Sequence, residues 1–305
     1  MDKKTDGAGE LALGLKYFGG IGCKEDKAKA EKHFAEALKC GEKKAAYWLG
    51  MCVQGTDEKR AEKYFKSAMK DGDNDAARAL GLLLKKQHRY KAAAQAFTLG
   101  SQRGDDGCRY YLGLQLMTGL GIAEDRNRAM ALFEEAARGG DMEALAELGR
   151  AYMLSHEYEK AEPFIARAAE KGCLKALALL GRLKTEEELF LCERYGTKPN
   201  EATLAEGLKY CLPAARGDDP DGIYCLARAY ESGLGVKKDE KKALVFALSA
   251  AKLGNAEAMA LVGKLYEEGR GTGKDVEVAL RCYTAANSNG YKCPSDIKRV
   301  KKLIE

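Results

Sequence analysis

The chain contains no long apolar run. Nowhere do its 305 residues approach the roughly 18 to 20 consecutive apolar residues that a membrane-spanning helix needs. The first ten residues, MDKKTDGAGE, lack the apolar core of a signal peptide. We therefore expect a cytoplasmic protein without membrane insertion. Unconventional secretion would leave no such mark in the sequence and stays open as an alternative.

Patterns that would indicate a metal site are also missing. The three histidines, His33, His88 and His156, lie far apart in the sequence, and no Cys-x-x-Cys motif occurs. Metal-binding domains normally bring such ligands together at short, fixed spacings. We expect neither a metal site nor a cofactor.

Neither sign of charge dominates. Fifty-one basic residues stand against 46 acidic ones, which leaves a formal net charge of +5. A dedicated nucleic-acid binder usually concentrates more positive charge than this. The composition therefore gives little support to nucleic acid as a partner.

Motifs for catalysis are lacking as well. No serine lies in a Gly-x-Ser-x-Gly motif. The Gly-x-Gly pairs of the chain do not follow a predicted strand, as the loop of a dinucleotide-binding site would. We predict that the protein is not an enzyme and has no catalytic residues.

The chain does contain an internal repeat. A Leu-Gly pair, or a close equivalent, recurs eight times at steps of 31 to 36 residues, with one longer step of 46. The second residue of each pair, called the marker below, lies at Gly14, Gly50, Gly81, Gly113, Gly149, Gly181, Ala227 and Gly263. Periods of this length predict stacked helical hairpins.

The fourth repeat shows the pattern within one hairpin. Gly119 and Gly121 end a first helix, and Asp125 is suited to cap the next one. The second helix then carries a small, a large and a small residue on one face, spaced four and three residues apart. Similar ladders are Ala30-Phe34-Ala37, Ala61-Phe65-Ala68, Ala93-Phe97-Gly100, Ala129-Phe133-Ala136, Ala161-Ile165-Ala168 and Ala279-Tyr283-Ala286.

The ten cysteines do not follow the repeat. They occupy different positions relative to the markers, whereas a disulfide framework in a repeat protein should recur once in each repeat. We expect mostly buried, reduced thiols that serve as small apolar residues. Whether any of them is redox-active stays open.

The last two repeats, CLARAYESGLGVKKDEKKALVFALSAAKLGN and AMALVGKLYEEGRGTGKDVEVALRCYTAANSNG, carry the pattern most fully. This pattern resembles the Sel1-like repeat, a relative of the tetratricopeptide repeat. The resemblance implies an all-α, right-handed α-solenoid of about eight hairpins with a C-terminal capping helix. The predicted parts are a tail at 1–7, repeats at 8–41, 42–72, 73–104, 105–140, 141–172, 173–218, 219–254 and 255–290, and a cap at 291–305.

Two segments depart from the rhythm. The sixth repeat is about ten residues too long, so that residues 185–206 carry either a longer helix or a loop. Pro213 should remove a hydrogen bond from the second helix of that repeat and bend it. In the cap, Ile297, Val300 and Leu303 or Ile304 share one face, and Lys298, Arg299, Lys301 and Lys302 are interpreted as solvated residues.

The resemblance also implies a concave groove, lined by positions three before and one or four after each marker. These positions give Tyr47, Met51, Gln54, Arg78, Leu82, Lys85, Tyr110, Leu114, Met117, Arg150, Met153, Arg182, Tyr224 and Arg228, followed by Lys264 and Glu267 in the last repeat, with Glu268 adjacent. Arginine, tyrosine and methionine are enriched in protein interfaces. Few acids are expected to face these arginines before the last repeat, which would favour an acidic or carboxylate-ended peptide.

These observations favour a non-catalytic scaffold or adaptor that binds a partner protein or peptide in the groove. Two alternatives remain: a secreted effector or host-interaction protein of the same repeat class, and a protein that binds single-stranded RNA. The sequence specifies neither the partner nor the oligomeric state. It also leaves open whether the 185–206 insertion is a second binding site.

Overall fold

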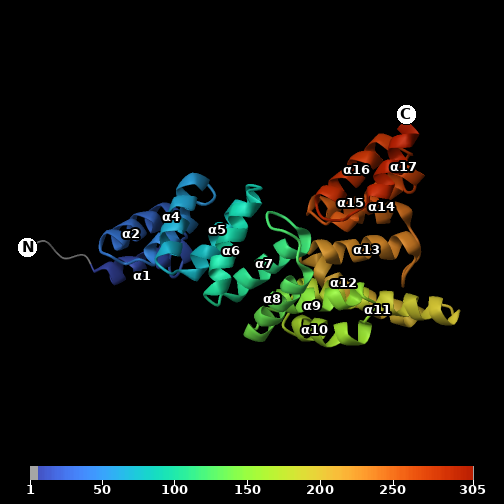
Figure 1. The fold of residues 1–305 in the computed structure, drawn as a ribbon, viewed down its shortest axis with the longest axis horizontal. Helices are drawn as coiled ribbons and strands as arrows, with labels where there is room; N and C mark the ends of the chain where they lie inside the picture. Colours follow the sequence, from blue (N-terminus) through green and yellow to red (C-terminus); the bar gives the residue numbers. More distant parts are fainter. Residues whose placement is uncertain (1–5, 305) are drawn as a thin grey trace, which may run out of the picture. The chain divides into compact units, whose positions relative to one another are not determined.

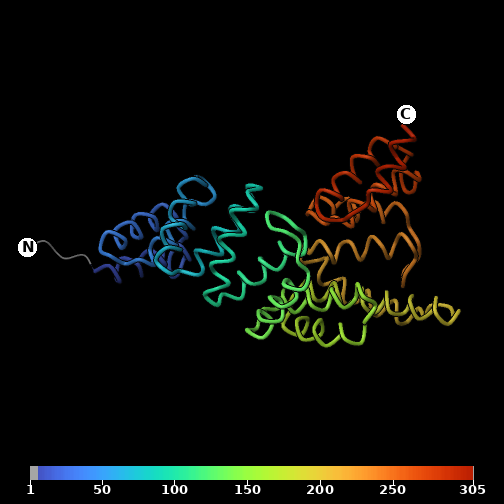
Figure 2. Tube along the Cα trace, in the orientation of Figure 1, coloured from blue at the N-terminus to red at the C-terminus, as the bar shows by residue number. Residues whose placement is uncertain are grey.

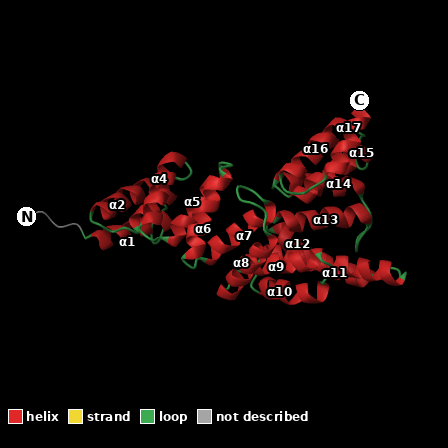
Figure 3. Cartoon of the chain, in the orientation of Figure 1, coloured by secondary structure: helices red, strands yellow, loops and turns green. Residues whose placement is uncertain are grey.

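The structure, a computed structural model, describes residues 6–304, which form helices and turns without a strand (Figure 3). The all-α prediction is confirmed. The seventeen helices of this range are α1 (Gly7–Gly19), α2 (Lys27–Lys39), α3 (Ala45–Val53), α4 (Glu58–Lys70), α5 (Asn74–Lys86), α6 (Tyr90–Gln102), α7 (Asp106–Thr118), α8 (Arg126–Gly139), α9 (Met142–Leu154), α10 (Tyr158–Glu170), α11 (Leu174–Tyr195), α12 (Glu201–Arg216), α13 (Pro220–Ser232), α14 (Glu240–Lys252), α15 (Ala256–Glu268), α16 (Val276–Ser288) and α17 (Pro294–Ile304).

The chain divides into two compact halves, one ending at Gly140 and the other beginning at Asp141. The N-terminal half contains α1 to α8 and the C-terminal half α9 to α17 (Figure 1). Within each half, consecutive helices pack against each other as antiparallel hairpins, and the chain can be followed through them in Figure 2. The predicted repeat boundaries and the handedness of the superhelix stay predictions.

In most hairpins, the marker of the first helix packs against the large residue of the second helix. A Cβ atom added to Gly113 would lie 2.6 Å from the Phe133 ring, a distance that real Cβ atoms do not adopt. The ladder residues of the second helices, including Phe34, Phe65 and Phe97, are fully buried. The small markers therefore allow the close helix packing that the ladders predict.

The turns between paired helices use the residues predicted for them. Gly119 ends α7 in the left-handed conformation, with φ of 70°, and Gly121 has φ of 79°. The Asp125 carboxylate then accepts a hydrogen bond from the Arg128 backbone N–H at 2.9 Å. Asp26, Asp239 and Asp275 cap their helices in the same way. The predicted capping role of these aspartates is confirmed.

An aromatic cluster fills the start of the N-terminal half. Trp48 of α3 lies with its ring centroid 5.3 Å from that of Phe18 and 6.0 Å from that of Phe34. The Tyr47 ring packs edge-on against Trp48, at 5.1 Å between centroids. Side chains from α1, α2 and α3 therefore pack against one another in this cluster.

In the sixth repeat, the first predicted alternative, a longer helix, is the one that forms. Helix α11 runs for 22 residues and extends beyond its neighbours (Figure 1). Its added turns bring Phe190 onto the His156 ring, with 5.2 Å between centroids, so part of the insertion is packed. Pro213 lies inside α12, and that helix continues to Arg216.

The cap forms, with one correction. Val300 is fully buried, and Ile297 packs against the same cluster beside α16. Leu303 and Ile304, of which one was expected to complete the apolar face, are instead 55% and 46% exposed. Only the first two turns of α17 therefore supply the apolar contact.

Most of the cysteines are buried, as predicted. All ten are free thiols in the structure, and those at Cys52, Cys108, Cys192, Cys211, Cys225 and Cys293 are buried. Burial raises the pKa of Cys52 to about 11. Cys211 of α12 takes the place of the large ladder residue, because a Cβ atom on Gly181 would meet its sulfur.

Candidate functional site

The predicted groove residues of the N-terminal half lie on α3, α5 and α7, the first helices of their hairpins, except Gln54, which follows directly after α3. Tyr110 is buried, whereas the others are half-buried: Tyr47, Met51, Gln54, Arg78, Leu82, Lys85, Leu114 and Met117. Tyr47 lines a hollow of about 410 Å³ beside the turn between α4 and α5. Whether the whole row acts as one binding surface stays a prediction.

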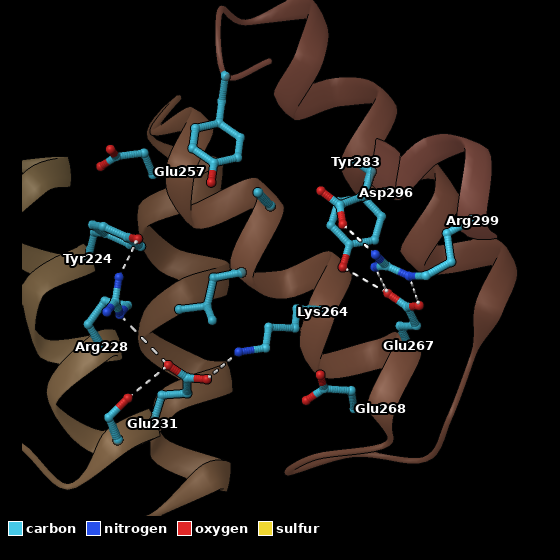
Figure 4. Close-up of a pocket in the computed structure, with 14 residues that line it drawn as sticks. Tyr224, Arg228, Glu231, Glu257, Lys264, Glu267, Glu268, Tyr283, Asp296 and Arg299 are labelled. Atoms are coloured by element: carbon cyan, nitrogen blue, oxygen red, sulfur yellow. Dashed lines mark hydrogen bonds and ion pairs between the residues drawn. The ribbon is translucent and has the colours of Figure 1, made fainter. Parts of the chain in front are cut away.

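In the C-terminal half, the predicted residues converge more closely. Tyr224 and Arg228 line a pocket of about 590 Å³ together with Lys264 and Glu267, which the same spacing rule selects in the last repeat, and with the adjacent Glu268 (Figure 4). Arg182 lies behind Tyr224, with its guanidinium 5.7 Å from the ring centroid. Arg150 is half-buried and Met153 is buried on α9. Neither lines this pocket.

Helical spacing places the pocket residues. Tyr224, Arg228 and Glu231 follow one another at four and three residues along α13, so they share one face of that helix. Lys264 and Glu267 do the same on α15. Helices α13 and α15 lie against each other, and α16, the following loop and α17 complete the pocket.

One side of the pocket, called the basic wall, consists of Arg228 and Lys264 around Glu231. Lys264 Nζ donates to Glu231 at 3.1 Å, and Arg228 Nε lies 3.7 Å from the same carboxylate. Arg270, outside the pocket, donates to Glu231 at 2.9 Å. The Glu231 side chain is only 7% exposed, whereas those of Arg228 and Lys264 are each 46% exposed. Two half-exposed cations therefore face the pocket above one buried carboxylate.

The cations around Glu231 lower the pKa of its carboxyl group. Burial alone would raise the pKa of this carboxyl group, but hydrogen bonds from Lys264 and Arg270 lower it below its ordinary value. Glu231 therefore stays charged and holds the two cations in place. Arg228 also donates to the Tyr224 hydroxyl at 3.4 Å.

The opposite side, called the acidic wall, consists of Glu267, Glu268, Asp296 and Arg299. Arg299 donates to both Glu267 oxygens at 2.8 Å and to Asp296 at 2.7 Å. The Tyr283 hydroxyl donates to Glu267 at 2.9 Å. The hydrogen bonds from Arg299 lower the pKa of Glu267, against the opposing effect of burial. Glu268 is 43% exposed and pairs with Arg270 at 3.1 Å.

A smaller cavity of about 40 Å³ lies next to the pocket and shares Tyr224 and Arg228 with it. Arg182 lines this cavity and donates to Glu257 at 2.8 Å. Burial lowers the pKa of Arg182, but the charges of Glu257 and Glu186 outweigh it and raise the pKa. The Arg182 cation is therefore committed to structural ion pairs.

The expectation that few acids face the groove arginines is wrong. Arg78 pairs with Asp105 at 2.9 Å and with Asp75, and Arg182 pairs with Glu257 and Glu186. Arg150 pairs with the buried Glu147, which also binds Lys175. Burial alone would raise the pKa of Glu147, but Lys175 and Arg150 together lower it. Sequence spacing missed these pairs because their acids come from other registers of the same or neighbouring helices.

Several pocket residues escaped the sequence prediction. Glu231 lies four residues after the marker Ala227, so the spacing rule that selected Arg228 could have selected it too. Tyr283 was identified only as a ladder residue. Arg299 was interpreted as solvated, yet it is bound to Glu267, 32 residues away in sequence. No local signal reveals a pair so distant.

Two negative findings hold for residues 6–304. No cluster of three or more histidine, cysteine, aspartate or glutamate side chains is arranged to hold a metal ion. None of the helices in this range combines the length and the apolar character needed to cross a membrane.

Two solved structures resemble the chain along almost its entire length. One, from uropathogenic Escherichia coli strains, is described as c5321, a protective antigen displaying an SLR fold; it is 21% identical, with a TM-score of 0.55, covering 99% of this chain and 73% of that one. The other, a Sel1 repeat protein from Oxalobacter formigenes, is 21% identical, with a TM-score of 0.52, covering 98% of this chain and 88% of that one. A comparison with curated proteins found no match. The two structures show a shared solenoid fold.

The family model described as Sel1 repeat matches five segments, at residues 8–42, 43–73, 108–141, 220–255 and 256–291. Together they cover more than half of the chain. The last two contain most of the pocket residues, including Arg228, Lys264 and Glu267. The chain belongs to the Sel1 repeat family.

Proposed function

We propose that the protein is a non-catalytic scaffold that binds a segment of a partner protein in the pocket between α13 and α17. Proteins of the Sel1 repeat family generally serve as scaffolds for protein–protein interactions. The observation that supports this site is the pocket of about 590 Å³, which has the size of a ligand-binding cleft and is lined by polar groups and tyrosines. Tyrosine and arginine anchor many protein interfaces.

The basic wall suits a carboxylate of the partner. Lys264 uses one of its three N–H donors on Glu231, and both contacts of Arg228 within the chain are long, at 3.4 and 3.7 Å. Donors therefore remain for an aspartate or glutamate side chain or for a chain terminus. The carboxylates of the acidic wall would repel a nucleic-acid backbone, which makes RNA a poor fit to this site.

Affinity capture from the native lysate, read by mass spectrometry, tests the proposal. Arg228→Glu should reduce the recovered partner by at least about tenfold, because it replaces a donor with a like charge at the contact. Arg228 suits this test better than Arg78, Arg150 or Arg182, because those arginines compensate acids within the chain. Reversing their charge would destabilise the fold.

The matched control is Arg281→Glu. Arg281 lies exposed on α16, outside the pocket, so this variant makes the same change of charge elsewhere in the C-terminal half. It should recover the partner as the wild type does. If both variants recover equally little partner, the net charge of the protein and not the pocket is responsible. If Arg228→Glu recovers as much partner as the wild type, the pocket is not the binding site.

A further inference from the structure

The two walls of the pocket present different exposed charges. The basic wall has two cations, Arg228 and Lys264, each 46% exposed, over the buried Glu231. Glu257 lines the pocket on the same side, is 30% exposed and pairs with Arg182, which does not line it. The acidic wall has three carboxylates, of which Glu267 and Asp296 pair with Arg299 and Glu268 pairs with Arg270. In Figure 4, the acidic residues Glu267, Glu268 and Asp296 lie on the far side of Lys264 from Arg228. The exposed cations Arg228 and Lys264 therefore lie on one side of the pocket and the exposed carboxylate of Glu268 on the other.

The exposed charges on both sides are accessible from the pocket. Glu268 lines it with 43% of its side chain exposed, close to the exposed fraction of Arg228 and Lys264. Glu268 pairs with Arg270, which does not line the pocket, so Glu268 is the group of this pair that a ligand in the pocket can contact. A ligand with one sign of charge would be attracted by one wall and repelled by the other.

The pocket lining also includes less polar surface. The exposed Tyr291 side chain lines it from the loop before α17, next to the mostly buried Ala260 and Leu261 of α15. A small ion bound in the pocket would leave this surface uncovered. A peptide segment covers it with its backbone and side-chain stems.

We propose that this pocket selects a peptide segment carrying an acidic and a basic side chain close together in sequence. The acidic side chain binds Arg228 and Lys264, and the basic side chain binds Glu268 beside Glu267. This inference rests on the proposed scaffold function and specifies the chemistry of the partner at the same site. It replaces recognition of a purely acidic segment, because such a segment would leave the acidic wall repelling it.

A peptide pool tests this selectivity with the full chain. The pool consists of hexapeptides, acetylated and amidated so that no terminus is charged, in which every position is Glu, Lys, Gln, Tyr or Leu. After incubation, bound peptides are separated by size exclusion and identified by mass spectrometry. Peptides that contain both Glu and Lys should be enriched about tenfold over peptides with either charge alone.

Two charge-reversal variants extend the test. Each is expected to enrich a class of peptides that the wild type does not, which an unfolded protein cannot do. Arg228→Glu should shift enrichment toward peptides with Lys and without Glu. Glu268→Lys should shift it toward peptides with Glu and without Lys. Arg281→Glu, the control outside the pocket, should keep the wild-type pattern.

Equal enrichment of singly charged peptides by the wild-type protein would overturn the inference, and so would a variant pattern that does not shift. Absence of any enrichment would overturn it as well. If lysate capture still depends on Arg228 in that case, the scaffold function stands while the paired-charge selectivity fails. The two proposals therefore fail separately.

Discussion

At the scale of single residues, the size of the ladder residue in the second helix determines which residue can serve as the marker packed against it. Where the ladder carries Phe133, the marker is Gly113, since no Cβ atom fits against the ring. In the seventh repeat the corresponding ladder residue is Ala247, and it shares a buried cluster with Ala227. Without a phenyl ring at this position there is room for the alanine methyl group, so Ala227 can stand where the other repeats have glycine.

This pairing predicts that opposite exchanges both lose stability. Gly113→Ala should lower the free energy of unfolding, because overpacking a buried contact costs about 1–3 kcal/mol and outweighs the roughly 1 kcal/mol that alanine gains over glycine in a helix. Ala227→Gly should cost up to about 1 kcal/mol for the converse helical preference. Chemical denaturation of both variants checks the two signs. A stabilised Gly113→Ala protein would contradict the packing account.

At the scale of elements, the C-terminal cap does more than cover the last hairpin. Asp296 and Arg299 of α17 form part of the pocket lining, and Arg299 joins α17 to α15 through Glu267. The cap therefore couples the stability of the chain end to the shape of the site. This coupling depends on an ionised carboxylate.

The ion pair predicts a pH-dependent stability. The pKa of Glu267 is lowered in the folded state, so its contribution is complete above the ordinary carboxyl pKa of about 4.3 and is lost as pH falls through the lower folded value. Glu267→Gln should therefore lower the Tm at pH 7, and the difference from wild type should shrink below about pH 4. Circular dichroism melts at several pH values measure this. Glu193→Gln, at an exposed site on α11, serves as the control, and a Tm difference for Glu267→Gln that stayed constant with pH would refute the coupling.

The hairpins were predictable because their signals are local. The distance from Ala129 to Phe133, or from Gly119 to Asp125, is set by one helix or one turn, and the structure confirms both. The pocket was predictable only in part. Tyr224, Arg228 and Lys264 follow from their registers, whereas the bond between Arg299 and Glu267 depends on how three helices pack. The ion pairs from Arg78 to Asp105 and from Arg182 to Glu257 are likewise tertiary, whereas those to Asp75 and Glu186 lie within one helix and could have been found from spacing.

At the scale of the whole molecule, the pocket belongs to one half of the chain. All its lining residues lie between Tyr224 and Arg299, within the C-terminal half that begins at Asp141. The predicted repeats of this half number four, and solenoids need about three or more repeats for stability. The half therefore has both the length and the residues that binding requires.

We expect a fragment of residues 141–305 to fold and to recover the same partner as the full chain. A helical circular dichroism spectrum with a cooperative melt establishes folding, and capture from the lysate then establishes binding. Arg228→Glu in the fragment should abolish recovery as in the full chain. A folded fragment that captures nothing would mean that residues before Asp141 contribute to the binding site.

The aromatic cluster of α1 to α3 has a practical consequence. Trp48 is the sole tryptophan of the chain, and its ring contacts Phe18, Phe34 and Tyr47. Its fluorescence emission therefore reports the opening of the first hairpins, while a far-ultraviolet signal averages over all helices. In a repeat array whose cooperativity is incomplete, the two unfolding curves separate along the denaturant axis. The native sequence thus carries a built-in optical probe of the N-terminal half, with no label to attach.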